Sequence, residues 1–119
     1  MAFISNLDEL CEQAKNNTFY RRVIETYNDT QSVVMHLIPG EDIPMEIHKG
    51  KIQFLFVFSG EGKVFTGDRT SFVNSGDIII IPFDTEHYVG NSGKDPLKLI
   101  SFYSPPEHPK NRVNERKPK

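Results

Sequence analysis

Four side chains able to bind a metal ion lie in two short segments of otherwise apolar, strand-forming sequence. The first segment holds Glu46, His48 and Gln53, and the second holds His87. Residues two apart on a strand share a face, so we expect Glu46 and His48 to point the same way. A polar side chain inside an apolar core is unfavourable unless it has a partner. A divalent metal ion would be a partner for all four, because first-row metals accept imidazole nitrogen together with carboxylate or carbonyl oxygen.

The segments that must position these side chains have the pattern of short β-strands. Glycine, proline, asparagine and aspartate separate them at intervals typical of a β-sandwich or β-barrel. The pattern therefore predicts an all-β fold. The expected strands are 19–27, 31–38, 43–49, 52–58, 62–66, 70–73, 77–82, 86–91 and 97–104.

One short helix is expected before the strands. Ser5 is a suitable N-cap, and Leu7, Leu10, Cys11 and Ala14 then follow at helical spacing. We therefore expect three parts. These are an N-terminal helical segment (1–18), a single β domain (19–109) and a polar, basic tail on the surface or frayed (110–119).

Composition argues against several classes of protein. A net charge of −2 gives no reason to expect nucleic acid as a partner. No apolar run reaches the roughly 18 residues of a transmembrane helix, and the first residues lack the pattern of a secretory signal. Cys11 is the single cysteine, which favours a reducing, cytoplasmic setting.

Three phenylalanines are expected on the outside of the strand that carries Gln53. If Gln53 faces inward, alternation turns Phe54, Phe56 and Phe58 outward. An exposed aromatic patch normally marks an interface, so the sequence predicts a homodimer. The alternative is that a second sheet or the N-terminal helix covers these rings.

The spacing of these residues resembles that of the cupins. The first cupin motif corresponds to Gly40, Glu46-Ile47-His48, Gln53 and Gly60, and the second to Gly76, Pro82, His87 and Asn91. The resemblance extends over about residues 19–109 and is greatest to small single-domain cupins described as phosphomannose-isomerase-like. It implies a cupin-type β-barrel, or jelly roll.

The resemblance also implies a metal site formed by Glu46, His48, Gln53 and His87. Three residues depart from the usual motifs, because Glu46 replaces a histidine, Gln53 a glutamate and Asp84 a glycine. The charge of the ligand set is unchanged, since the carboxylate has only moved. Gln53 offers a neutral carbonyl oxygen, so we expect it to be the weakest ligand. The alternative is a cupin without metal, in which Glu46 and Gln53 form hydrogen bonds with His48.

The implied cofactor is a divalent Zn, Mn, Fe or Ni ion, and the implied ligand is a small sugar-like or oxygenated metabolite. Zinc would suit sugar isomerisation, as of mannose 6-phosphate, whereas iron or manganese would suit a dioxygenase. Isomerisation also needs a general base, and the sequence identifies none. A non-catalytic module that binds a small molecule is therefore the alternative to an enzyme.

Four further residues have expected places. We expect Tyr103 and Arg22 to contact the substrate, or alternatively only to pack or pair. Asp84 is expected in a tight turn, since aspartate tolerates the left-handed conformation. His108, among prolines near the tail, is expected on the surface.

Overall fold

The computed structural model describes residues 4–14, 17–18 and 20–118 and consists almost entirely of β-strands. The predicted all-β fold is confirmed. The elements, in chain order, are α1 (Leu7–Cys11), β1 (Glu12–Ala14), β2 (Asn17–Thr18), β3 (Arg21–Tyr27), β4 (Thr30–Leu37), β5 (Asp42–Glu46), β6 (Ile52–Ser59), β7 (Glu61–Thr66), β8 (Arg69–Asn74), β9 (Ile78–Ile81), β10 (His87–Asn91), β11 (Leu97–Ser104) and β12 (Val113–Asn114).

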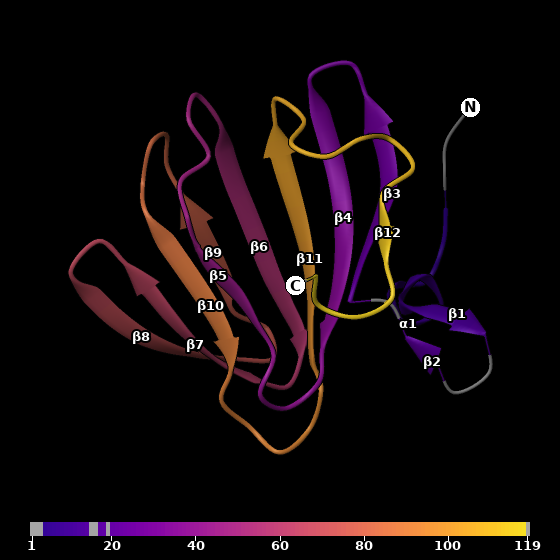
Figure 1. Ribbon diagram of the computed structural model, residues 1–119, viewed down its shortest axis with the longest axis horizontal. Coiled ribbons are helices and arrows are strands. Elements are labelled where there is room, and N and C mark those ends of the chain that lie inside the picture. Colours follow the sequence, from indigo (N-terminus) through magenta and orange to yellow (C-terminus); the bar gives the residue numbers. More distant parts are fainter. Residues whose placement is uncertain (1–3, 15–16, 19, 119) are drawn as a thin grey trace.

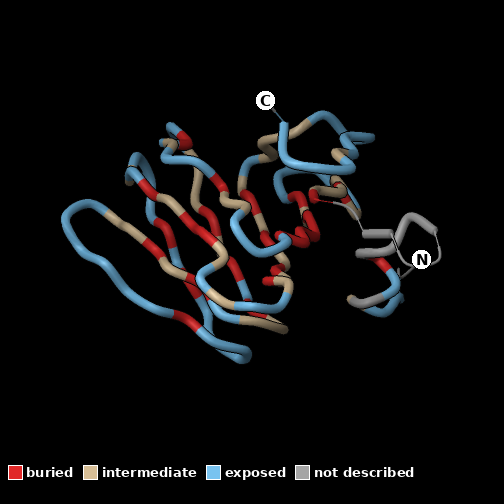
Figure 2. The backbone as a smooth tube through the Cα atoms, turned by 60° about the horizontal axis from the view of Figure 1, so that its bottom comes forward, coloured by how far each residue is buried: buried red, intermediate tan, exposed pale blue. Residues whose placement is uncertain are grey.

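Two antiparallel sheets form the body of the protein (Figure 1). One has six strands in the order β12-β3-β4-β11-β6-β9, and the other has four in the order β5-β10-β7-β8. The apolar core lies between them, since one cluster of buried side chains draws on both sheets. In Figure 2 the buried stretches follow the strands, whereas the turns at their ends are exposed.

Strand alternation decides what enters this core. On β6, Gln53, Leu55 and Val57 are buried, and the phenylalanines between them face outward as expected. Phe58 is covered by Leu10 and its neighbours on the helix side of the sheet, whereas Phe56 remains 39% exposed. The helix side of the sheet therefore covers one of the outward rings, as the alternative expected, and leaves Phe56 exposed.

The N-terminal helix is shorter than its apolar spacing indicates. It begins after Asn6, whose side-chain oxygen accepts a hydrogen bond from the Glu9 N–H, so Asn6 rather than Ser5 is the N-cap. The helix ends at Cys11, and the next residues pair as strand β1 with β2. Leu10 packs on Val34, which lies on the outer face of the six-stranded sheet.

Gly60, the last residue of the first motif, has a packing role. Its φ of +92° is unfavourable for other residues, and an added Cβ would lie only 2.9 Å from the Cα of Leu97. The turn from β6 to β7 thus depends on glycine because the segment before β11 passes directly against it.

The tail is only partly what the sequence predicts. Val113 and Asn114 add strand β12 to the edge of the six-stranded sheet by pairing with β3. Beyond them Arg116 and Lys117 form ion pairs with Glu41 and Asp42. The basic side chains therefore hold this segment against the acidic start of β5.

Candidate metal centre

Three of the four predicted ligands, Glu46, His48 and His87, come together at one end of the barrel, and Gln53 lies at the same end, opposite Tyr103 on β11. Glu46 ends β5 and His87 begins β10, and the two residues are register partners in the four-stranded sheet. Gln53 lies near the start of β6 in the six-stranded sheet. His48 lies just beyond β5, in the connection between the two sheets, although the pattern predicted it within the strand.

Glu46, His48 and His87 are close enough to share one ion. His48 Nε2 lies 3.1 Å from Glu46 Oε1, and His87 Nε2 lies 3.8 Å from the same oxygen. The two imidazole rings stand 5.0 Å apart, and the ligand atoms of the three residues all lie within 4.8 Å of one another.

Each histidine is held so that Nε2 is left for the interior. His87 Nδ1 lies 3.0 Å from the Thr85 carbonyl oxygen, which can only accept, so Nδ1 carries the proton. His48 Nδ1 faces the carboxylate of Glu107 at 3.3 Å, and Lys51 fixes that carboxylate at 2.8 Å. Such contacts set the tautomer of metal-binding histidines and raise their basicity.

A hydrogen bond within the protein also fixes the side chain of Gln53. It is 1% exposed, and its Nε2 donates a hydrogen bond to Ser101 Oγ at 2.8 Å. Its amide oxygen is then the free atom. The sequence left open a metal-free arrangement in which Glu46 and Gln53 both bond to His48. Glu46 does lie 3.1 Å from His48 Nε2, but Gln53 bonds to Ser101 instead.

The free atoms fit a metal ion. Within the described part of the chain, His48 Nε2, His87 Nε2 and Gln53 Oε1 are buried without a hydrogen-bond partner. The Glu46 carboxylate forms an ion pair with His48 at 3.1 Å. Buried polar atoms left unpaired are unfavourable. Two imidazole nitrogens, a carboxylate and an amide oxygen are a donor set that divalent first-row metals accept.

Electrostatics keep the carboxylate of this set ionised. Burial works to raise the pKa of Glu46, but His48, His87 and Arg21 outweigh it and lower this pKa. Burial lowers the pKa of His87. At His48 burial also acts to lower the pKa, but the carboxylates of Glu46 and Glu107 prevail and raise it.

The two residues expected at the substrate lie in different places. Tyr103 is buried beside the site, with its ring 5.3 Å from the ring of His48. Arg22 is not brought to this end, because its guanidinium donates to the Leu10 carbonyl on the helix side of the sheet. The arginine that faces the interior is its neighbour, Arg21.

The segment after β11 supplies contacts that the sequence did not reveal. Gln31 binds the backbone of Glu107 and His108 from both sides, accepting from both N–H groups and donating to the His108 carbonyl. The ring of His108 consequently stands 5.5 Å from that of Tyr103, with a buried Nε2, so the expectation of a surface histidine was wrong. The sequence did offer one sign of these contacts. Gln31 lies two residues before Val33 on the same strand, so it is a polar residue at an inward position that needs a hydrogen-bond partner.

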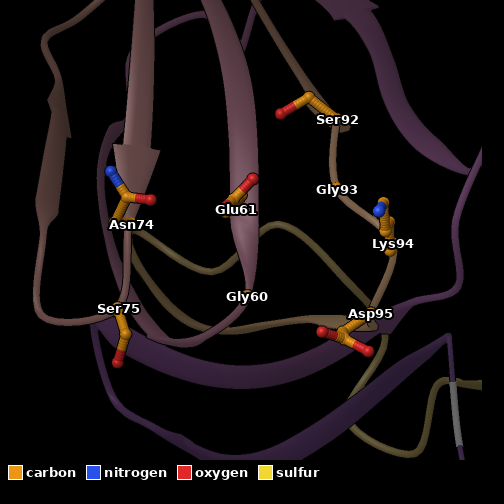
Figure 3. Close-up of a pocket in the computed structure, with 8 residues that line it drawn as sticks. All are labelled: Gly60, Glu61, Asn74, Ser75, Ser92, Gly93, Lys94 and Asp95. Atoms are coloured by element: carbon orange, nitrogen blue, oxygen red, sulfur yellow. The ribbon is translucent and has the colours of Figure 1, made fainter.

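A separate cavity lies at the opposite end of the strands. Its volume is about 550 Å³, and it lies among the turns after β6, β8 and β10 (Figure 3). Its lining side chains are spread around the rim, and Asn74, Ser75 and Lys94 are exposed. Asn91 of the second motif closes the nearby turn by donating to the Leu37 and Asp95 carbonyls. The candidate metal ligands therefore lie at the other end of the barrel from this cavity.

Comparison with known proteins agrees with this geometry. The cupin domain family matches residues 33–103, which include all four predicted ligands. The chain belongs to the cupin family. Among proteins of known structure it is similar to BH2720 from Bacillus halodurans, with a TM-score of 0.88 and 38% identity. That match covers 98% of this chain and 90% of the other.

Two curated relatives extend the comparison. The chain is 39% identical over 111 residues to the uncharacterized protein L612 of Acanthamoeba polyphaga mimivirus, covering 90% of this chain and 69% of the relative. It is also 35% identical over 66 residues to the mannose-1-phosphate guanylyltransferase RfbM of Salmonella typhimurium. That match covers 56% of this chain but only 14% of the enzyme. No helix in the described part of this cupin is long and apolar enough to cross a membrane.

Proposed function

We propose that this cupin binds a divalent metal ion through Glu46, His48, Gln53 and His87, and uses it to hold or transform a small oxygenated metabolite. The observation that supports the proposal is the grouping of the Glu46 carboxylate with the buried imidazoles of His48 and His87, whose ligand atoms lie within 4.8 Å of one another. A bound ion of this kind polarises a carbonyl or hydroxyl oxygen of the ligand. The identity of the metal distinguishes the reactions, since zinc suits isomerisation whereas iron or manganese suits oxygen chemistry.

A non-catalytic binding module is the second candidate. Its support is that the tyrosine and the two carboxylates described beside the ligands are not free to act as a base. Burial raises the pKa of Tyr103, Glu107 is paired with Lys51, and Glu46 is itself a ligand. Sugar isomerisation, as of mannose 6-phosphate, remains a narrower proposal that draws on the resemblance and on the match to part of a mannose-1-phosphate guanylyltransferase.

Metal analysis of untagged protein, purified without chelator, tests the first proposal. We expect close to one equivalent of Zn, Mn, Fe or Ni, or recovery of one equivalent after stripping and reloading. Less than about a tenth of an equivalent, with no rebinding, would contradict the metal site.

Replacement of both histidines gives a second test. We expect His48→Ala with His87→Ala to abolish metal binding and to retain the fold, because the core between the sheets is mainly apolar. Circular dichroism and a cooperative unfolding transition report the fold. Global unfolding of the double variant would show that the two histidines are structural.

We also propose that the protein is a homodimer. The outer face of β9, β6 and β11 carries six apolar side chains in register, in two rows of three. From β9 through β6 to β11, one row is Ile78, Phe56 and Ile100, and the other is Ile80, Phe54 and Phe102. Ile80 is 52% and Ile78 47% exposed. A second copy could cover this face, as exposed apolar patches normally mark interfaces. A monomer mass in sedimentation at all concentrations would contradict this proposal.

A cytoplasmic location is the remaining proposal. It draws on the single cysteine, Cys11, which suits a reducing compartment. Localisation of the tagged full-length protein by cell fractionation tests it, and recovery outside the cytoplasmic fraction would contradict it.

A further inference from the structure

Arg21 is a charged residue on the inner side of the six-stranded sheet. On β3 it lies two residues before Val23 and opposite Met35 of β4, and both of these belong to the apolar core. An arginine on an inward position is unfavourable unless its donors are satisfied. Its contacts are therefore informative.

The guanidinium of Arg21 is only partly satisfied within the protein. Nη1 donates to Asn114 Oδ1 at 2.9 Å, and the group stands 5.2 Å over the Tyr20 ring. Nε is buried, and it has no hydrogen-bond partner among the described residues. No carboxylate in the described part of the chain forms an ion pair with this group. Its positive charge thus has neutral partners only.

The charge of Arg21 affects the pKa of residues at and near the proposed metal ligands. Its charge helps to lower the pKa of Glu46 and opposes the rise that burial causes in the pKa of Tyr103, and burial together with Arg21 lowers the pKa of His108 to about 4. His108 Nε2 is a second buried and unpaired atom. The rings of His108, Tyr103 and His48 follow one another at 5.5 and 5.3 Å. Unpaired polar atoms thus continue from the metal ligands as far as His108, whose pKa the charge of Arg21 helps to lower.

We infer that Arg21 binds the carboxylate of a small hydroxy acid or oxo acid, whose second oxygen faces the four proposed metal ligands. This assignment rests on the proposed metal site and names the class of its ligand. The edge of a guanidinium that contains Nε matches a planar carboxylate with two parallel hydrogen bonds. One guanidinium balances one negative charge, and the nearby carboxylates of Glu46 and Glu107 disfavour a dianion.

Glycolate and its neutral analogue glycolamide test this inference, with Kd values measured by NMR titration of metal-free and Zn²⁺-loaded protein. We expect wild type to bind glycolate at least about tenfold more tightly, as hydrogen bonds to charged groups are worth that factor or more. Arg21→Met should remove the preference and leave the Zn²⁺ affinity, measured by calorimetry, within about threefold.

Arg22→Met is the matched control, because it removes the same charge from the adjacent residue on the helix side of the sheet. We expect it to keep the preference for glycolate. If Arg21→Met fails to fold, Arg21→Lys replaces it and should lose at least threefold in glycolate affinity, since an ammonium lacks the planar pair of donors.

The outcomes separate this inference from the metal proposal. An Arg21-dependent preference without Zn²⁺ binding would support the carboxylate site and contradict the metal site. Zn²⁺ binding with an unchanged preference in Arg21→Met, or with an equal loss in Arg22→Met, would overturn the role of Arg21. Inorganic phosphate that binds through Arg21 more tightly than glycolate would overturn the carboxylate assignment.

Discussion

His48 and His87 each use Nδ1 within the protein and keep Nε2 for the interior, yet their supports differ. A backbone carbonyl holds His87, whereas the ionised side chain of Glu107 holds His48. A carboxylate raises the basicity of the imidazole more than a carbonyl does. The affinity of the site for metal should therefore depend on Glu107, although Glu107 is not itself a ligand.

Replacement of Glu107 tests this positioning role. Glu107→Gln keeps the size of the side chain and removes its charge, and we expect about a tenfold loss of Zn²⁺ affinity with the fold intact. Competition with a chromophoric chelator measures the affinity. Glu86→Gln is the control, since Glu86 is exposed although it precedes His87 in the chain. Equal affinities of Glu107→Gln and wild type would contradict the role.

His108 should make the stability of the protein depend on pH. Burial, aided by Arg21 and Arg112 and opposed by Glu107 and Glu46, lowers its pKa from 6.5 to about 4. The unfolded chain therefore takes up the proton first, and the free energy of unfolding should fall as the pH drops from about 6.5 to about 4. His108→Phe keeps a ring against Tyr103, and its stability should fall less over this range. Denaturant unfolding at several pH values measures both slopes, and equal slopes would refute the assignment.

The connection from β5 to β6 carries His48, and the turn before β10 leads to His87. The side chain of Asp84 joins these two segments. Asp84 lies in the turn before β10 with a φ of 57°, and its Oδ1 accepts the Gly50 N–H at 3.0 Å. Gly50 belongs to the connection that carries His48. The expectation of Asp84 as a turn residue is confirmed, and its side chain also ties together the two segments that present His48 and His87.

Substitutions at Asp84 test the importance of its left-handed backbone conformation and of its hydrogen bond to Gly50. Asp84→Ala loses the hydrogen bond and places alanine in the left-handed region, so we expect a loss of about 1–2 kcal/mol in the free energy of unfolding. Asp84→Asn retains both features and should remain close to wild type. Urea unfolding measures the difference. An alanine variant as stable as the asparagine variant would show that neither feature matters.

Sequence patterns predicted the elements of the site better than its surroundings. Gln53 and His87 could be found because alternation on short strands fixes which side chains point inward. Glu46 could be found only from the motif, because a register shift in β5 separates it by three residues from the buried Ile43. Glu107 and His108 could not, because their position depends on the chain turning back after β11 and on Gln31 holding it there. Arg21 and Arg22 are adjacent, so the choice between them depended on the register of β3, which the sequence left open.

At the scale of the whole molecule, the proposed metal ligands join the two sheets. Glu46 and His87 belong to the four-stranded sheet, Gln53 belongs to the six-stranded sheet, and His48 lies in the connection between them. A bound ion would therefore link the sheets at one end of the barrel. Separation of the sheets on unfolding would require its release, so the stability of the entire domain should respond to metal.

Denaturant unfolding with and without Zn²⁺ measures this coupling. At free Zn²⁺ of a hundred times its Kd, wild type should gain about 2.7 kcal/mol in the free energy of unfolding, provided that the unfolded chain binds none. A chelator should remove the gain. The variant with His48→Ala and His87→Ala should show no gain, because Glu46 and Gln53 alone provide too few donors. An equal gain in wild type and variant would place the ion elsewhere on the protein, and no gain in either would mean that the folded barrel has no preference for the metal.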